Sequence, residues 1–216
     1  MLLSRNPEAL ATIRRPTPED PLRILTSGCL AGRPVGIDGT DYGLGVRLAA
    51  FRELPRVRFF QFCPEDHGIG TPRQMPDLHG GDGRAFWRGE ARVLDEDGRD
   101  RSADMSRGAE AMLACAREHR VELCILTDSS AACGTQIVYE GYRLKTRNYT
   151  RGIGVAAALL DAAGFLVVAQ RDDWTLERVR EIVEPGYVAR ADAKDFHESD
   201  WYVKEYPDGR TSGDRS

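Results

Sequence analysis

Long hydrophobic runs are missing from this chain of 216 residues. No stretch approaches the roughly 18 uninterrupted apolar residues of a membrane-spanning helix, and the first residues, 1–8, lack the apolar segment of a secretory signal. A charge excess is missing too, since 30 Lys and Arg residues stand against 34 Asp and Glu residues, for a net charge of -4. These absences predict a cytoplasmic protein with no membrane partner and no nucleic-acid partner.

Cysteine is scarce and odd in number, with five in the chain. An odd count without a secretion signal disfavours a disulfide framework and favours metal binding or catalysis. Cys115 lies in a helical pattern and Cys124 in an apolar run, so we expect both to be buried as small hydrophobic side chains. The other three, Cys29, Cys63 and Cys133, each follow a strand-like run and lie in turn-rich segments.

Strand-like runs alternate with helical patterns along the chain. This alternation predicts a Rossmann-like α/β fold, with a mainly parallel sheet and helices on both faces. The expected strands are residues 22–27, 57–62, 121–127 and 165–169, and the expected helices are 42–54, 104–120, 152–163 and 174–183. A hairpin is expected within 136–150, with 137–139 and 142–144 pairing across Glu140 and Gly141, and residues 64–83 are expected to be mostly loop over the site.

A single domain is expected over residues 22–185. Residues 1–21 carry four prolines among charged residues, so we expect an N-terminal arm outside the core. Residues 186–216 are polar and form a C-terminal extension, whose last ten residues we expect to be disordered.

The three strand-end cysteines predict a metal site. In an open α/β sheet, ligands bind at the carboxyl ends of the strands, so thiolates from three such ends are expected to converge. Thiolates are soft ligands that suit zinc and iron-sulfur clusters. Three of them leave two arrangements: a zinc ion completed by His67 or His79, or a four-iron cluster with one iron open to an external ligand. A site without metal is a third alternative.

Several motifs in a fixed order, over about residues 22–170, resemble the DUF523 proteins, the family of the thiouracil desulfurase. They are Leu25-Thr-Ser-Gly-Cys-Leu-Ala-Gly-Arg-Pro-Val with Asp38-Gly39, Cys63-Pro-Glu with Gly70-Thr-Pro-Arg, Cys133-Gly, and Gly152-Ile-Gly-Val-Ala-Ala-Ala-Leu-Leu. The resemblance implies a non-redox desulfurase with a [4Fe-4S] cluster on Cys29, Cys63 and Cys133. It also implies that the open iron takes the sulfur of a small thiocarbonyl substrate, such as a thiolated pyrimidine.

Five further residues are candidates for the chemistry. Glu65, two residues beyond a ligand, is the candidate for proton transfer, and its alternative role is to cap the next turn. Asp38 is a second candidate acid or a turn residue. Ser130 is expected to hydrogen-bond a substrate carbonyl or to cap backbone. Arg73 and His67 are expected to bind substrate, with a bracing role against Asp66 or Asp77 as the alternative for the arginine.

The chain departs from the family pattern around the third cysteine. Ser129-Ser-Ala-Ala stands where the family usually has Arg-Ser-Pro-Ser. Retained ligands with a changed lining predict a thiocarbonyl substrate other than thiouracil. The motif at Gly152, which opens a helix, is expected to offer free amides to an anion or a cluster sulfide. Two other classes stay open: a zinc-dependent hydrolase on the same cysteines, and a non-catalytic protein in which the metal joins three loops or senses oxidation.

Overall fold

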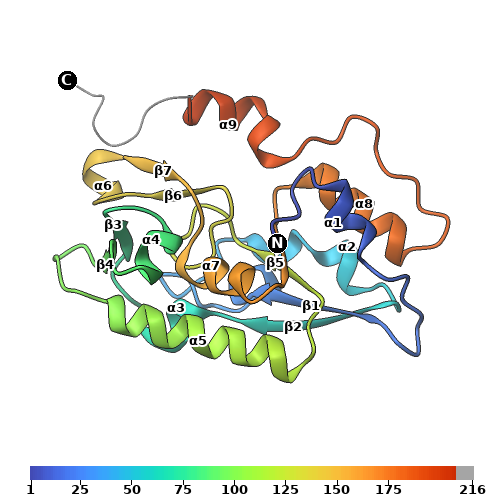
Figure 1. Cartoon of the computed structure of the whole chain (residues 1–216), viewed down its shortest axis with the longest axis horizontal. Coiled ribbons are helices and arrows are strands. Elements are labelled where there is room, and N and C mark those ends of the chain that lie inside the picture. Colours follow the sequence, from blue (N-terminus) through green and yellow to red (C-terminus); the bar gives the residue numbers. More distant parts are fainter. Residues whose placement is uncertain (208–216) are drawn as a thin grey trace.

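The computed structural model describes residues 1–207, and its centre is a parallel sheet of four strands. These strands are β1 (Leu22–Ser27), β2 (Val57–Phe62), β5 (Leu123–Leu126) and β8 (Leu166–Ala169). They pair in the order β2-β1-β5-β8, with every pairing parallel (Figure 1). The mainly parallel α/β architecture predicted from the alternating pattern is therefore confirmed.

Two small antiparallel sheets lie outside this centre. One pairs β3 (Asp77–His79) with β4 (Arg92–Leu94), and the other pairs β6 (Ile137–Tyr139) with β7 (Tyr149–Arg151). The second is the expected hairpin, but its returning strand is not residues 142–144. After Gly141, which has a φ of 78°, the chain first forms a helical turn and only then returns.

Helices connect and cover the strands. The longer ones are α5 (Ser102–Glu118), α7 (Val155–Ala162) and α8 (Asp173–Val183). The short ones are α1 (Pro7–Ala11), α2 (Ala49–Arg52), α3 (Pro64–Gly68), α4 (Gly83–Trp87), α6 (Arg143–Thr146) and α9 (Asp200–Glu205). Three 3-10 turns are η1 (Gly28–Ala31), η2 (Leu44–Val46) and η3 (Phe196–Glu198). In residues 1–207, no helix combines the length and apolar character needed to cross a membrane.

The segments 42–54 and 64–83 differ from expectation. A single helix over 42–54 is wrong, because Tyr42 and Gly43 take positive φ values of 54° and 68° and only η2 and α2 form. Residues 64–83 contain α3 and β3 in addition to loop.

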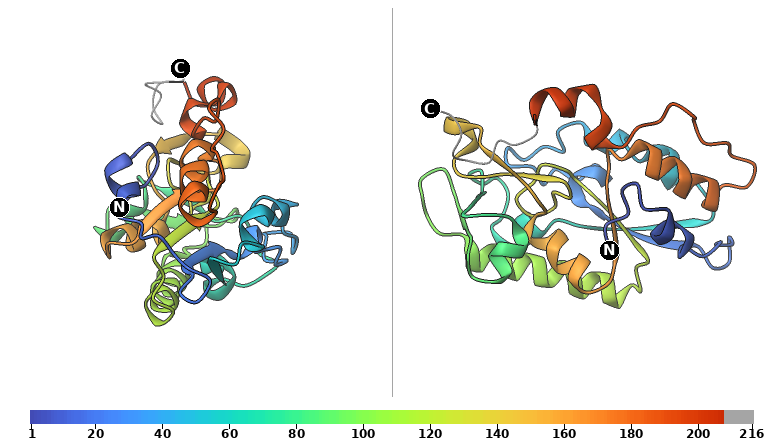
Figure 2. Two further views of the ribbon diagram at one scale, coloured as in Figure 1. Left: turned by 90° about the vertical axis from the view of Figure 1, so that its right-hand side faces the viewer. Right: turned by 45° about the horizontal axis from the view of Figure 1, so that its top comes forward.

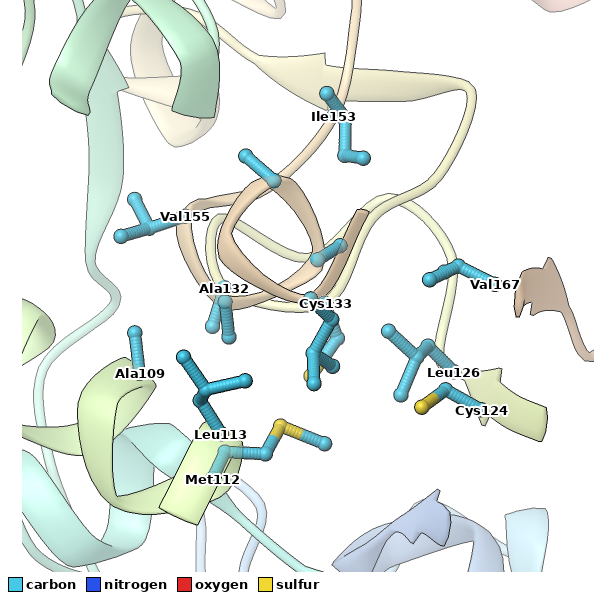
Figure 3. Close-up of a cluster of buried hydrophobic side chains, with 14 of the residues drawn as sticks. Ala109, Met112, Leu113, Cys124, Leu126, Ala132, Cys133, Ile153, Val155 and Val167 are labelled. Atoms are coloured by element: carbon cyan, nitrogen blue, oxygen red, sulfur yellow. The ribbon is translucent and has the colours of Figure 1, made fainter. Parts of the chain in front are cut away.

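The sheet is buried on both faces, as its apolar strands require. Successive side chains of a strand point to opposite faces, so Leu25 packs toward α5 and α7 whereas Ile24 packs toward α1, α2 and α8. Figure 3 shows part of the first cluster, in which Met112 and Leu113 of α5 lie below Ala132 and Cys133, and Leu126 lies beside Cys124 of β5. The predicted placement of helices on both faces is therefore confirmed.

The N-terminal residues belong partly to the core. Leu3 is fully buried, and Leu10 and Ile13 pack against the same face as α8. The backbone N–H of Leu3 donates to the carbonyl of Val167, and the N–H of Val167 donates to the carbonyl of Met1. The expectation that this segment lies outside the core is wrong for these residues, because they cover the otherwise unpaired edge of β8.

The C-terminal extension packs on the β6–β7 hairpin. Phe196, Tyr202 and Tyr206 are buried in one cluster with Ile137 and Tyr149. Figure 2 shows α9 and α8 on the side of the molecule opposite α5. The predicted disorder of the last ten residues falls, apart from Pro207, outside the described residues.

Two glycines hold α3 directly against α5. A Cβ at Gly68 would overlap the carbonyl oxygen of Asp104, and a Cβ at Gly108 would overlap that of Pro64. The two helices therefore meet backbone to backbone. This contact fixes the position of α3, which begins directly after Cys63.

We expect Gly108→Ala to lower the free energy of unfolding by about 1–3 kcal/mol, because the added methyl group pushes α3 away from α5. The measurement is urea denaturation followed by circular dichroism. The matched control is Glu110→Ala on the exposed side of α5, with an expected change within about 0.5 kcal/mol. In a helix without this contact, Gly→Ala stabilises by up to about 1 kcal/mol, so a more stable Gly108→Ala variant contradicts the close approach.

A buried carboxyl group ties the extension to the end of β8. Asp172 is fully buried and accepts hydrogen bonds from the backbone N–H of Phe196 (3.1 Å) and of Ala169 (3.2 Å), and from the side-chain amide of Gln136. Burial, followed by the negative charge of Asp195, raises the pKa of Asp172 to about 7.

The raised pKa of Asp172 predicts a pH-dependent stability. The folded state holds this proton more tightly than the unfolded chain, where an aspartic acid titrates near pH 3.9. The free energy of unfolding is therefore expected to fall as the pH rises from about 4 to about 7, by at most about 1.4 kcal/mol per pH unit. Urea denaturation across this range measures the slope. Asp172→Asn, whatever its absolute stability, is expected to have a smaller slope, and an unchanged slope contradicts the assignment.

Candidate metal centre

Three cysteines follow three adjacent strands of the sheet. Cys29 lies in η1 directly after β1, Cys63 directly after β2, and Cys133 in the turn region after β5. Because β2, β1 and β5 are neighbours and run parallel, their carboxyl ends lie side by side. The structure thus brings the three predicted ligands to one edge of the sheet.

The thiols are close enough to affect one another. A Cβ at Gly28 would lie 3.2 Å from the Cβ of Cys63, so the residue before Cys29 is in tight contact with the second cysteine. Negative charge on Cys63 or on Cys29 raises the pKa of the Cys133 thiol. Cys124, by contrast, is fully buried in the apolar cluster of α5 and β5, as predicted, whereas Cys115 packs against this cluster and is only partly buried.

Burial favours the neutral form of each thiol. It raises the pKa of Cys29, raises that of Cys63 to about 12, and holds that of Cys133 well above its ordinary value. Polar neighbours oppose this effect: the Thr127 hydroxyl lies 2.9 Å from the Cys29 sulfur, and the N–H of Asp66 donates to the Cys63 sulfur at 3.4 Å. A metal that binds here displaces thiol protons, so its binding strengthens as the pH rises.

The donor set fits a cluster better than a single ion. Within residues 1–207, no group of three or more His, Cys, Asp or Glu side chains is arranged to hold one metal ion. A tetrahedral zinc ion needs all its ligands within about 2.3 Å of one point. In an iron-sulfur cluster each thiolate binds a different iron, which demands a wider spacing. Three soft thiols on one edge are a donor set that an iron-sulfur cluster can take, with one iron left free of protein ligands.

Glu65 stands at the centre of a polar network beside the thiols. Its Oε1 accepts a hydrogen bond from the Ser130 hydroxyl at 2.8 Å, and its Oε2 accepts one from the Arg73 guanidinium at 2.6 Å. The negative charge of Glu65 raises the pKa of all three thiols, Cys29, Cys63 and Cys133. This carboxylate therefore lies within electrostatic reach of the whole centre.

Arg73 braces the site. Only 4% of its side chain is exposed, and its Nη1 donates to the carbonyls of Val35 (3.0 Å) and Gly70 (3.1 Å). Its carboxylate partner is Glu65, rather than Asp66 or Asp77. The geometry supports the bracing role, but with a partner that the sequence did not predict. The two expected partners pair elsewhere: Asp66 faces Arg33, and Asp77 pairs with Arg143.

Ser130 links the carboxylate to the third cysteine. Its hydroxyl oxygen accepts hydrogen bonds from the backbone N–H of Cys133 (3.0 Å) and Ala132 (3.2 Å) while the hydroxyl donates to Glu65. The capping alternative is thus part of its role. Two polar neighbours of the thiols, Thr127 and Ser27, were not predicted from the sequence. Their positions at the ends of β5 and β1 were the signal that could have identified them.

Two other candidates stand apart from this network. Asp38 is exposed and accepts hydrogen bonds from the N–H (2.9 Å) and hydroxyl (2.8 Å) of Thr40, the geometry of an Asx turn. His67 is exposed on α3, with its ring 5.3 Å from that of Phe62. In the described part of the chain, neither makes a hydrogen bond with Glu65 or a thiol. The geometry supports the turn role for Asp38.

The helix that begins after Gly154 has no free amides for an anion. The N–H groups of Gly154, Val155 and Ala156 donate to carbonyls of residues 131–134. A Cβ at Gly154 would lie 2.8 Å from the backbone nitrogen of Cys133. The expectation of free amides is therefore wrong, because α7 packs its first turn directly on the loop that carries the third cysteine.

These features define an open α/β protein that carries three thiols and a carboxylate at one edge of its parallel sheet. Residues 24–172 match the 2-thiouracil desulfurase family. The chain is 30% identical to the uncharacterized protein YbbK of Bacillus subtilis (strain 168), over 69% of this chain and 96% of that protein. It resembles the solved structure of the [4Fe-4S]-dependent thiouracil desulfidase TudS with a TM-score of 0.55 and 29% identity, over 68% of this chain and 90% of that one.

The chain belongs to the 2-thiouracil desulfurase family, also called DUF523. The resemblance predicted from the motifs is confirmed. Family membership and the structural relative support a desulfidase enzyme. The match ends at residue 172, so the whole of α8 and the C-terminal extension lie outside it.

We expect Arg73→Met to destabilise the fold by about 3 kcal/mol, because it leaves the Glu65 carboxylate, which is 12% exposed, without its cation. Urea denaturation measures the change. The double variant Glu65→Gln/Arg73→Met is expected to be more stable than the sum of the two single changes predicts, by about 1 kcal/mol or more. If the two single changes in the free energy of unfolding simply add, the Glu65–Arg73 ion pair does not contribute to stability. Arg88→Met, which breaks an exposed pair with Glu90, is the matched control and is expected to change little.

Proposed function

We propose that this protein removes sulfur, as sulfide, from a small thiocarbonyl compound such as a thiolated pyrimidine. We further propose that Cys29, Cys63 and Cys133 hold a [4Fe-4S] cluster for this reaction. The observation that carries the proposal is the gathering of three thiols and one carboxylate, Glu65, at a single edge of the parallel sheet.

The bound cluster would supply one iron without a protein ligand, a Lewis acid suited to the soft sulfur of a thiocarbonyl group. Overall, one water replaces the sulfur, C=S becomes C=O, and the sulfur leaves as hydrogen sulfide. The oxidation state of carbon is unchanged, so the reaction needs no electron donor. It does need a group that moves two protons from the attacking water to the departing sulfur.

Glu65 is placed to move those protons. The guanidinium of Arg73, at 2.6 Å, holds one oxygen of the Glu65 carboxyl group in place. We propose that Glu65 accepts a proton from the attacking water. The Ser130 hydroxyl holds the other oxygen of the carboxylate and thereby orients it. Arg73 and Ser130 are therefore positioning residues in this proposal, and Glu65 is the acid–base group.

The substrate is proposed to differ from thiouracil itself. Ser129, Ala131 and Ala132 surround Ser130 where the family usually carries an arginine and a proline, and both alanines are buried. An arginine lost near the centre removes a strong donor for a substrate oxygen. The lining thus favours a thiocarbonyl compound with fewer acceptors on that side.

We expect the protein purified without oxygen to be brown and to contain about four irons and four sulfides per chain. Cys29→Ala, Cys63→Ala and Cys133→Ala are each expected to lose most of this iron. The controls, Cys115→Ala and Cys124→Ala, are expected to keep it. Absorption spectra with iron and sulfide analysis measure the content. A colourless wild type with stoichiometric zinc would instead favour the hydrolase, and loss of iron in a control variant would overturn the ligand assignment.

We expect Glu65→Gln to retain the iron and sulfide but to lower kcat for sulfide release by about 10²–10⁴-fold, because glutamine cannot carry a proton. Sulfide release from thiouracil and other thiocarbonyl compounds is measured under anaerobic conditions. Asp38→Asn, an equal change at an exposed turn, is expected to keep its activity. An unchanged kcat in Glu65→Gln, with the cluster retained, contradicts the acid–base role. No sulfide release by the wild type or the variant favours the non-catalytic class.

A further inference from the structure

A pocket lies beyond the carboxyl end of β8, where the C-terminal extension meets the domain. Its volume is about 610 Å³ and it opens to solvent. Its floor comes from Arg171 and Asp173, directly after β8, and its wall from the segment 190–201, which runs back from α8 to α9 (Figure 1). Arg47, from the segment after η2, closes one side. The pocket therefore exists only because the extension folds back onto the domain.

Cations dominate the lining of this pocket. Arg47, Arg171, Arg190 and Lys194 face two carboxylates, Asp173 and Asp192. Three of the cations are paired in the structure: Arg47 with Asp173 at 3.7 Å, Arg190 with Glu177 at 3.0 Å, and Lys194 with Asp200 at 3.2 Å. The lining residues carry four positive and two negative charges, and Glu177 and Asp200, which are not part of the lining, compensate two of the cations.

Arg171 forms no direct ion pair within the described residues, although its positive charge reaches the buried carboxyl group of Asp128. Its guanidinium carbon lies 4.9 Å from the ring centroid of Phe196 and 5.3 Å from that of Trp201. Within residues 1–207 its guanidinium has no hydrogen bond and no ion pair in the structure. The aromatic contacts hold the planar group in place and leave its N–H donors free. A guanidinium fixed in this way is suited to bind two oxygens of one anion.

We infer that this pocket binds a small dianion of the phosphate class, either free phosphate or a phosphate monoester, with Arg171 as the principal donor. A phosphate monoester carries close to two negative charges at neutral pH and offers three acceptor oxygens. The exposed ring of Trp201, 48% accessible at the rim, offers a surface for an organic group attached to the phosphate.

This site is separate from the proposed desulfidase centre. The residues of its wall, 190–201, lie beyond the family match, which ends at residue 172. A bound dianion would join the extension to the end of β8, because Arg171 belongs to the domain whereas Arg190 and Lys194 belong to the extension. The ligand is therefore expected to stabilise the packed position of the extension.

The experiment is calorimetric titration of the cluster-loaded protein, without oxygen and at constant ionic strength, with inorganic phosphate and with phenyl phosphate. We expect a dissociation constant in the millimolar range or below for at least one of them. Equal affinities identify the free ion as the natural ligand class, and tighter binding of phenyl phosphate identifies a monoester. Arg171→Gln is expected to weaken binding about tenfold or more, as loss of charge-assisted hydrogen bonds does.

Matched variants separate this site from general charge and from the cluster. Asp192→Asn, which removes a repelling carboxylate, is expected to tighten binding, and Arg88→Gln, an exposed arginine outside the pocket, is expected to leave it unchanged. Glu65→Gln is also expected to bind phosphate normally. Lys194→Gln repeats the test if Arg171→Gln does not fold. No binding of either probe, or equal binding by wild type, Arg171→Gln and Lys194→Gln, overturns the inference whatever the desulfidase assay shows.

Discussion

Parallel pairing of β1 with β2 on one side and with β5 on the other is the constraint on which the candidate centre depends. Strands that run the same way release the chain at the same edge, so three segments far apart in sequence emerge side by side. All parts of the candidate centre follow the carboxyl ends of these strands. They are the three thiols, the helix that carries Glu65 and the turn that carries Ser130. Helices cover both faces of the sheet, which leaves this edge as the place where polar chemistry can meet a ligand.

The buried Glu65–Arg73 pair then gives the edge its shape. One carboxylate joins the exit of β2 to Ser130 beyond β5, while the guanidinium also holds the carbonyls of Val35 and Gly70. Breaking a buried ion pair leaves a charge that neither water nor a partner stabilises, which costs several kcal/mol. The Glu65–Arg73 pair therefore holds these segments together. The same pair that positions the loops also holds the Glu65 carboxyl group beside three thiols. Structure and proposed proton transfer therefore rest on one contact.

The C-terminal extension adds a different chemistry to the same side of the molecule. Asp172 and Asp195 anchor it through backbone N–H groups, and its aromatic residues pack on β6 and β7. This packing creates the basic pocket beyond β8. The three thiols follow β2, β1 and β5, whereas the cations of the basic pocket lie beyond β8, the last strand in the sheet order. The family fold thus carries the first site, and the segment outside the family match builds the second.

The sequence by itself determined the strands, the parallel class of the fold and the cysteines that follow strand ends, because periodicity and turn chemistry are local properties. It also separated Cys115 and Cys124 by their apolar surroundings. Only the tertiary structure decided that Glu65 binds Ser130, 65 residues away, and that Arg73 braces Glu65 instead of Asp66. It also decided that Leu3 lies in the core. Most of these contacts join residues far apart in the chain. They depend on how the loops after β2 and β5 pack together and on the unpaired edge of β8, and no pattern within a few residues contains that information.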